Sequence, residues 1–326
     1  MIKKYIKQDS KKSKGIDKPF TQLFLLCILI IMVVFISINS PFFFTWNNIR
    51  NILDHCSLKL ILAIGMTFVI ATGGIDLSIG SMVAIIGIVM GLLLKNNFSI
   101  ELSIGLGILT GAILGIINGM IISLFKIAPF IVTIGTMSLY RGLALVITEG
   151  TPIYGFPLEF TYFGKGDFGK INPPIILSIA LIVLSLFLLK YTKWGQYTLA
   201  LGGNEESLRR VGVYVKFYKT TVYMFSGLTA ALASLIMTSR LNAAEPNAGF
   251  MLETDIIAAV ILGGTSMKGG KASIGGTIIA CILLSVMRNG LTILSISSYY
   301  QQLFIGLIII ISVTVSEIRQ RRQVQI

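Results

Sequence analysis

The sequence is poor in charge, and this deficiency limits the kind of protein it can form. Charged residues make up 13% of the 326 residues, whereas about 25% is usual for a soluble globular protein. Apolar residues make up 54%, and the mean hydropathy is +0.85. So few ionisable groups could not cover a soluble surface, and the high hydropathy excludes intrinsic disorder. We therefore expect an all-α protein that crosses a membrane several times.

Histidine and cysteine are also scarce, with one His and three Cys. These numbers exclude a disulfide framework, a zinc cluster and a His-based catalytic array. A phosphate loop aligned on Gly270-Lys271 would place Thr265 at its first glycine and Ala272 at its magnesium-binding Ser or Thr. We therefore expect that the chain is not an enzyme, does not hydrolyse ATP itself, and uses no cofactor or metal.

Long stretches without Asp, Glu, Lys or Arg predict the membrane helices, each of which needs about 20 apolar residues. Two of these windows, which begin at Leu60 and Ile256, are short and run into glycine pairs. Each either extends across a flanking charge or forms a half-helix buried in protein. We expect about ten transmembrane helices, with a range of eight to ten, some short or broken. The windows span residues 19–49, 60–75, 77–94, 102–125, 127–140, 171–189, 220–239, 256–267, 272–287 and 289–316.

The basic residues predict the orientation, because Lys and Arg concentrate in cytoplasmic loops. Seven Lys within the first twenty residues and three Arg after residue 318 place both termini in the cytoplasm. The predicted organisation is a basic tail at 1–20, a membrane domain at 21–317 with a cytoplasmic loop at 192–219, and a tail at 318–326. The net charge of +13 is explained by this sidedness and by anionic lipids, without a nucleic-acid partner. Ten spans also place on the inside Lys126, Lys268, Lys271 and the loop 190–219.

Glycine recurs at every fourth position at 107, 111, 115 and 119. On a helix this spacing makes one smooth stripe, which allows close approach of a second helix within lipid. The stripe therefore predicts a helix contact, and the alternative is a smooth wall along a moving interface. The neighbouring Asn118 needs a partner or a polar path.

Two glycine-rich segments, 73–80 and 258–276, interrupt apolar runs in the two halves of the chain. Paired breaks of this kind can indicate an internal repeat with the transport path between its halves. Asp76 would either tie its break together or contact substrate, and Tyr299 and Tyr300 would contact substrate or lie in an interfacial aromatic belt. The candidates for the path are Asp76, Ser78, Asn118, Asn289, Tyr299, Tyr300 and Gln301.

The loop at 190–219 contains the signals of a short helix at about 205–211. Asn204 is a suitable N-cap, acidic Glu205 and Glu206 occupy the first turn, and Arg209 and Arg210 occupy the last. Gly212 is a suitable stop. The helix is either a linker on the lipid surface or a docking element for a cytoplasmic partner.

Several blocks, in order over nearly the whole chain, resemble the permease subunits of bacterial ATP-binding cassette (ABC) importers for monosaccharides. The resemblance is to the ribose, galactose and arabinose type, and within it most of all to ribose permeases. The blocks are Ser40-Pro-Phe-Phe-Phe-Thr, Gly65-Met-Thr-Phe-Val-Ile, Gly74-Ile-Asp-Leu-Ser-Ile-Gly80, Leu201-Gly-Gly-Asn-Glu205, Gly263-Gly-Thr-Ser-Met-Lys-Gly-Gly270 and Ser297-Ser-Tyr-Tyr-Gln301.

The resemblance implies an ABC importer permease fold in the bacterial inner membrane. It also implies a separate cytoplasmic ATPase, an extracytoplasmic sugar-binding protein, and a second permease subunit, identical or different. The short helix would insert into a groove on the ATPase, and its coupling residues would be Asn204, Glu205, Glu206, Arg209 and Gly212.

Two segments depart from the usual pattern of ribose permeases. The run Glu206-Ser-Leu-Arg-Arg replaces small residues, so the docking surface would suit one particular ATPase. The outer loop at 148–173 also diverges and would face the binding protein; its aromatic residues are Tyr154, Phe156, Tyr162 and Phe163.

Two other classes of membrane protein compete with this interpretation. An ion-coupled secondary transporter of a small polar solute would need an intramembrane carboxylate as a relay, and Asp76 is the one candidate. A receptor or membrane enzyme would need a soluble domain or a catalytic set, and the sequence offers neither.

Overall fold

The computed structural model describes residues 17–167 and 171–297 and, beyond these, residues 299, 300, 303, 306, 307, 310 and 314. The described chain is almost entirely helical, as predicted. Two short strands, β1 (Ile153–Tyr154) and β2 (Ala243–Ala244), pair antiparallel. The helices are α2 (Asp17–Asn39), α3 (Trp46–Ala71), α4 (Ile79–Lys95), α5 (Ile100–Phe125), α6 (Pro129–Thr148), α7 (Leu158–Lys165), α8 (Pro173–Tyr191), α9 (Lys193–Gly203), α10 (Glu205–Arg210), α11 (Val215–Leu241), α12 (Leu252–Leu262) and α13 (Ile274–Ile293).

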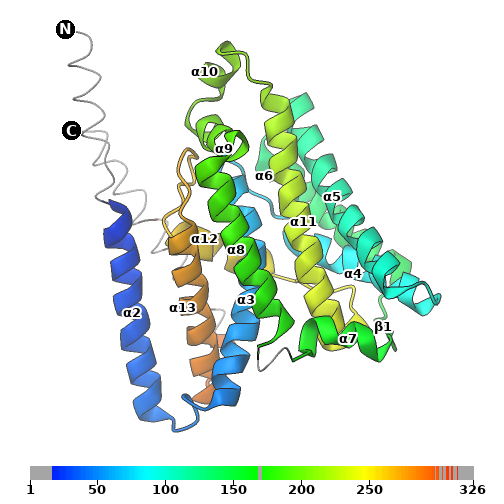
Figure 1. The fold of residues 1–326 in the computed structure, drawn as a ribbon, viewed down its shortest axis with the longest axis vertical. Helices are drawn as coiled ribbons and strands as arrows, with labels where there is room; N and C mark the ends of the chain where they lie inside the picture. The colour runs from blue at the N-terminus through cyan, green and yellow to red at the C-terminus, as the bar shows by residue number, and fades with distance from the viewer. Residues whose placement is uncertain are drawn as a thin grey trace.

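The long helices form one bundle with two distinct ends (Figure 1). Helices α9 and α10 lie at one end, which we call the α10 end, and α7 and β1 lie at the other, the β1 end. Within the described residues, seven helices are long and apolar enough to cross a membrane, and α4 is a shorter apolar helix of 17 residues. This pattern confirms a polytopic membrane protein. The seven are α2, α3, α5, α6, α8, α11 and α13.

The two short windows of the sequence illustrate both expected alternatives. The window at 60–75 belongs to α3, which extends back across Lys59 to Trp46 and has 26 residues. The window at 256–267 contains α12, a half-helix of 11 residues. The predicted boundary at Arg288 is wrong, because α13 continues to Ile293. Part of the tenth window, including residues 298, 301, 302 and most of 304–316, lies outside the described residues, so the count of ten stays a prediction.

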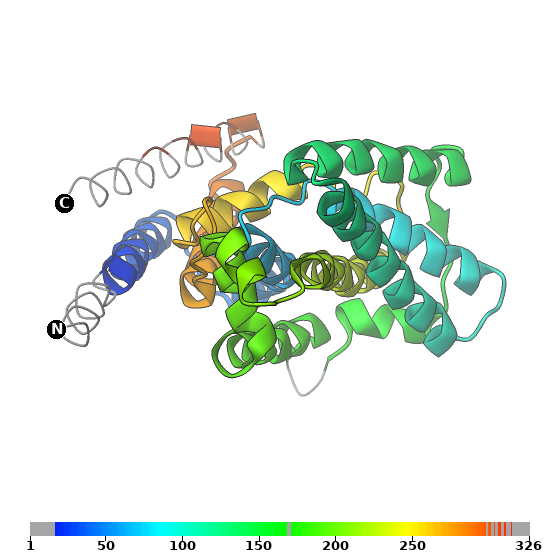
Figure 2. The same cartoon turned by 90° about the horizontal axis from the view of Figure 1, so that it is seen from above.

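Helix α11 lies near the centre of the bundle, where it packs most extensively against α5 (Figure 2). The glycine stripe of α5 faces α11, and a Cβ atom at Gly111 or Gly115 would collide with the backbone of Gly227 or Tyr223. The predicted helix contact is therefore confirmed. Such backbone contact is the main means by which helices associate in lipid, which supplies no hydrophobic drive.

The chain is irregular at two places inside the bundle, and the helices that follow them meet. Residues 72–78 lead from α3 to α4, and residues 245–251 lead from β2 to α12. The backbones of Gly80 and Gly249 touch, so the N-terminal ends of α4 and α12 lie against each other. From this point α4 runs to the β1 end, where Gly91 packs on Phe156, and α12 runs toward the α10 end.

Candidate coupling surface and translocation path

Helix α10 has the capping geometry that the sequence predicts. Asn204 has an extended backbone, and its Oδ1 accepts a hydrogen bond of 2.9 Å from the amide of Ser207. Gly212 adopts φ +83°, a left-handed conformation that stops the helix and that other residues reach only with strain. The helix spans Glu205–Arg210, which confirms the predicted element to within one residue.

Glu205 ties α10 to the start of α11. Its two carboxylate oxygens accept from Arg209 at 2.9 Å and from Lys219 at 2.5 Å. Burial raises the pKa of Glu205, but the hydrogen bonds and charges of Lys219 and Arg209 outweigh it and leave the pKa below its ordinary value. The carboxylate therefore stays ionised at neutral pH. Glu206 pairs with Arg210 on the exposed side of the helix.

One face of α10 is anchored and the other is open. Leu208 is buried with Leu201 of α9 and Val215 of α11. The following Val211 and Tyr214 are largely exposed. A cleft of about 600 Å³ runs beside the helix, and its charged lining residues are Lys126, Glu205, Arg209, Lys216 and Lys219. The open side thus combines apolar and charged groups suited to a protein partner.

The sequence did not predict α9 as a separate helix, yet α9 connects α10 to the interior. Its Gly202 packs against the carbonyl of Ala71 and the backbone of Gly269 and Gly270. The amide of Gly270 also donates to the Ala71 carbonyl at 2.9 Å. We call this meeting of Ala71, Gly202 and Gly269–Gly270 the glycine junction. It joins α9 to the end of α3 and to the loop between α12 and α13.

A buried polar network surrounds the break before α4. Asp76 accepts from the hydroxyl of Ser78 at 2.6 Å and of Ser226 at 2.9 Å. Asn118 donates to Ser78 Oγ at 2.8 Å, and Tyr140 donates to Asn118 Oδ1 at 3.2 Å. The structure thus brings together three path candidates, Asp76, Ser78 and Asn118. Their bonds hold the break against α5, α6 and α11, which supports the structural alternative for Asp76.

The remaining path candidates lie apart from this network. Asn289 and Asn48 exchange two amide hydrogen bonds of 2.7 and 3.1 Å, which join α13 to the start of α3. Tyr299 and Tyr300 are exposed, and Gln301 lies outside the described residues.

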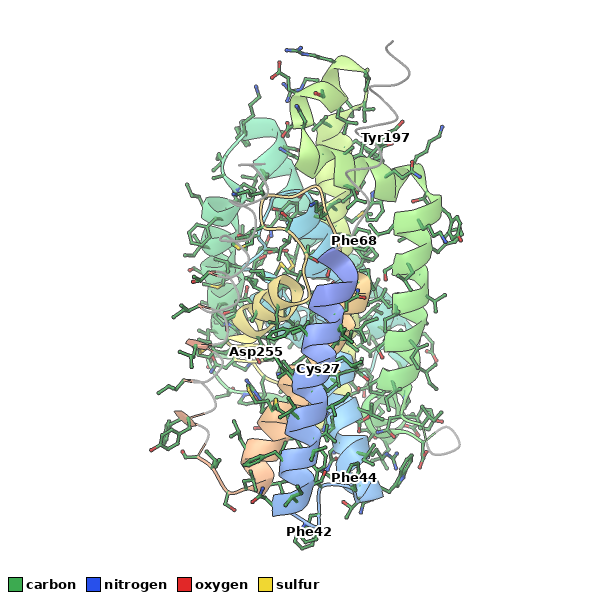
Figure 3. All side chains as sticks on the ribbon, turned by 90° about the vertical axis from the view of Figure 1, so that its left-hand side faces the viewer. Cys27, Phe42, Phe44, Phe68, Tyr197 and Asp255 are labelled. Carbon is green, nitrogen blue, oxygen red and sulfur yellow. The ribbon has the colours of Figure 1, made fainter. Side chains whose placement is uncertain are left out.

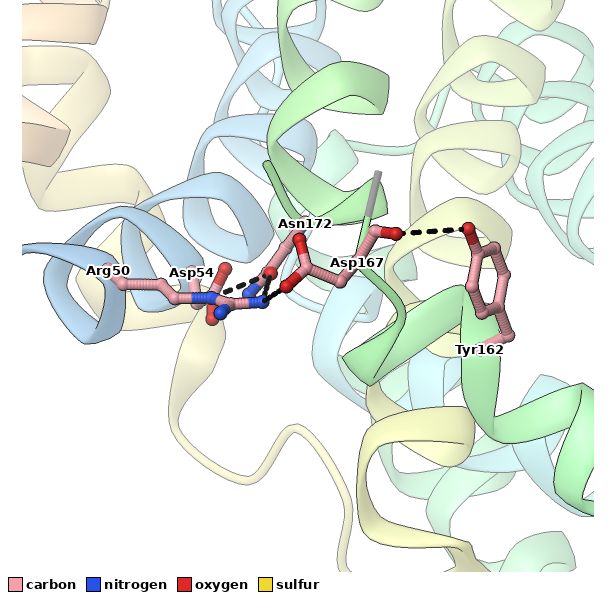
Figure 4. A network of polar contacts seen from close by, with 5 residues as sticks. All are labelled: Arg50, Asp54, Tyr162, Asp167 and Asn172. Carbon is pink, nitrogen blue, oxygen red and sulfur yellow. Dashed lines mark hydrogen bonds and ion pairs between the residues drawn. The ribbon is translucent and has the colours of Figure 1, made fainter. Parts of the chain in front are cut away.

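A second polar network fastens the chain at the β1 end (Figure 4). The Arg50 guanidinium donates to Asn172 Oδ1 at 2.8 Å and pairs with Asp167 at 3.5 Å, while Asn172 donates to Asp54 at 2.5 Å. These contacts hold the residues before α8 against α3.

Of the four aromatic residues named in the loop 148–173, Tyr154, Tyr162 and Phe163 are exposed and Phe156 is buried. The Phe156 ring is buried edge-on against Phe160, so this residue of the loop does not itself face outward. Phe156 belongs to the core that supports this end of the bundle.

Charged residues within the bundle were missed by the sequence analysis. Asp255 of α12 accepts from Lys59 of α3 at 3.0 Å and from Arg288 of α13 at 2.8 Å. Arg141 of α6 donates to the carbonyls of Pro246 and Ala248. A charged residue in the sequence is taken to mark the end of a membrane helix. Nothing in the neighbouring sequence indicates that these charged residues pair inside the bundle. Pro246 and Gly249 before α12 were the one available sign of the break.

Comparison with known proteins places the chain in a family. Residues 48–313 match the family model described as the permease component of the branched-chain amino acid transport system. The ribose import permease protein of Bacillus subtilis is 42% identical over 297 residues, 90% of each chain. The D-allose transport system permease protein of Escherichia coli is 37% identical over 292 residues, 89% of this chain and 90% of the relative. The L-arabinose transport system permease protein of Escherichia coli is 31% identical over 95% of both chains.

No solved structure matches the chain. The relatives and the family model both extend over most of its length, including α10 and both breaks. The chain belongs to the family of bacterial ABC transporter permease subunits.

Proposed function

We propose that the chain forms the translocation path for a monosaccharide, ribose or a related sugar, in an importer of the bacterial cell membrane. An extracytoplasmic binding protein delivers the sugar. The chain is a transport subunit and not an enzyme, and ATP is hydrolysed by a separate ATPase subunit. Relatives whose names specify ribose, allose and arabinose support a sugar. The observation that carries the proposal is α10, a capped, anchored and open-faced helix outside the membrane helices.

We assign the α10 end to the cytoplasm, with both termini on that side. Helix α2 begins at this end (Figure 1). Lys126 lies beside α10 in the cleft, and the loop that contains Lys268 and Lys271 packs on α9 through the glycine junction. The predicted inside residues thus lie together. The membrane domain is 21–317, and the tails are 1–20 and 318–326.

Helix α10 is the element that docks into the ATPase. Its cap and stop, Asn204 and Gly212, preserve the helix. The exposed Glu206–Arg210 pair faces the partner, whereas Glu205 and Arg209 lie nearer α11. A displacement of α9 and α10 then reaches two segments through the glycine junction. One is the irregular segment 72–78 after α3, and the other is the loop 263–273 between α12 and α13.

The complex contains a second permease subunit, identical or different, around one path. The irregular segment at 245–251 supports this arrangement, because non-helical backbone inside a membrane has to lie against protein or water and not against lipid. Asp76, Ser78 and Asn118 hold the break before α4, and Asn289, Tyr299, Tyr300 and Gln301 stay candidates for the walls.

Changes at the two ends of α10 should reduce coupling while leaving the protein in the membrane. Glu205→Ala removes the bond to Lys219, and Gly212→Val forces a β-branched residue into φ +83°. We expect sugar-stimulated ATP hydrolysis and uptake in proteoliposomes to fall several-fold in both variants. Co-purification with the ATPase measures docking directly.

Gly212→Asn is the matched control, because asparagine tolerates the left-handed conformation. It should retain most of the uptake. Unchanged uptake in both Glu205→Ala and Gly212→Val would refute the docking role of α10.

A further inference from the structure

The segment 245–251 is irregular backbone near the middle of the bundle, and three of its residues, Asn247, Phe250 and Met251, are exposed. Asp255, one turn into the helix that follows, lies about halfway between Tyr197 and Phe42, which mark the two ends of the bundle (Figure 3). Asn247 is exposed, and the Phe250 side chain is 71% exposed. Lipid offers no hydrogen bonds, so such backbone is tolerated only in contact with protein or water.

Charged side chains meet at the first turn of α12, the helix that follows this segment. Asp255 is buried between Lys59 and Arg288, and the Arg288 side chain is 44% exposed. A charge facing the centre of a bilayer is costly. Arg288 therefore faces water or a polar partner, and one carboxylate between two cations leaves this group with a net positive charge.

Helix α8 presents the contrasting kind of surface. Its exposed residues between Ile176 and Phe187 are apolar, and Val183 near its centre is 62% exposed. This surface has the composition expected of helices in contact with lipid. The apolar surface of α8 thus contrasts with the irregular segment 245–251, where the polar Asn247 is exposed beside Phe250 and Met251.

We propose that residues 245–251 and Arg288 form a sugar-contacting wall of the path. The Phe250 ring stacks on the apolar C–H face of the sugar. Asn247 and Arg288, which bind water when the path is empty, form hydrogen bonds with the sugar hydroxyls instead. A site of one aromatic ring and a few polar groups fixes orientation, yet it is open enough to release the sugar. This inference rests on the proposed function and assigns it specific residues.

Cysteine accessibility tests the proposal in the complete complex with its ATPase and binding protein. The parent is Cys27→Ala, because the other two cysteines, Cys56 and Cys281, are buried. Phe250→Cys in proteoliposomes should react with a charged, membrane-impermeant methanethiosulfonate reagent and lose uptake, and sugar-loaded binding protein with ATP should slow the reaction. Val183→Cys, at similar depth on α8, should not react.

Equal unreactivity of Phe250→Cys and Val183→Cys would overturn the proposal, and so would a reaction rate that sugar does not change. Uptake measured with the parent distinguishes failure of this proposal from failure of the proposed import function. A parent that takes up sugar while Phe250→Cys stays unreactive contradicts the wall alone. A parent that takes up no sugar under any condition contradicts the import function itself.

A substitution series gives an independent measurement. Phe250→Ala should raise the KM for sugar-loaded binding protein or lower uptake by several-fold, whereas Phe250→Tyr should behave as the parent does, because it retains the ring. Equal loss in both variants would show that the ring face is not what the site uses.

Discussion

Gly202→Ala should abolish sugar uptake, whereas Gly203→Ala should leave it close to that of the parent. A methyl group at Gly202 would collide with the Ala71 carbonyl and lie 2.5 Å from the Gly270 amide nitrogen. At Gly203 no described atom lies within 4 Å of the added carbon. Both positions lie at the end of α9, but only a methyl group added at Gly202 would collide with the glycine junction.

The sign of this prediction follows from two opposing effects. Alanine favours a helix over glycine by about 1 kcal/mol, which would stabilise α9 slightly in both variants. Overpacking a close contact costs about 1–3 kcal/mol, and here the atoms that must move belong to the backbones of α3 and the 263–273 loop. The collision dominates at Gly202, and it falls on the glycine junction, which joins α9 to the end of α3 and to the 263–273 loop.

Uptake and ATP hydrolysis should be measured together in proteoliposomes. We expect Gly202→Ala to assemble with the ATPase but to hydrolyse ATP without moving sugar. Melting temperatures of both variants show whether the fold survives. Equal uptake by Gly202→Ala and Gly203→Ala would show that the glycine junction does not transmit the motion of α10.

Asp76→Ala should have the second large effect, on the stability of the fold. Asp76 accepts hydrogen bonds from the backbone and hydroxyl of Ser78 and from Ser226, and all three residues are fully buried. Loss of a buried acceptor leaves its donors unsatisfied at about 1–3 kcal/mol each. We expect a loss of about 3 kcal/mol or more, with separation of α4 from α11.

Thermal unfolding of the purified complex measures this loss. Ser226→Ala is the matched control, since it removes one bond of the network and should lower the melting temperature by much less. An Asp76→Ala variant that melts with the parent and transports sugar would contradict the structural role. Normal melting with loss of uptake would instead place Asp76 in the path.

Local signals in the sequence predicted several features correctly. The cap at Asn204 and the stop at Gly212 are set by their own neighbours, so α10 could be predicted within one residue. The spacing of Gly107 to Gly119 predicted a helix contact, because a four-residue repeat fixes one face of a helix. The identity of the facing helix, α11, had no local signal.

Features that depend on distant partners could not be predicted in the same way. Arg288 sits inside α13 with Asp255 of α12 as its partner, and Asp255 also pairs with Lys59 of α3. A charge count along the chain treats Arg288 as the end of a helix. Gly202 looks like any glycine at the end of a helix until Ala71 and Gly270 are placed beside it. The break at 245–251 shows in the sequence as Pro246 and Gly249, but its depth in the bundle follows from the fold.

The energy source of uptake tests the central claim most directly. Proteoliposomes should contain this chain with its ATPase, the binding protein should be added outside, and labelled ribose should be followed with ATP inside or with a proton gradient alone. The account predicts uptake that requires internal ATP and is blocked by vanadate. Uptake driven by the proton gradient, without ATP and unaffected by vanadate, would contradict it.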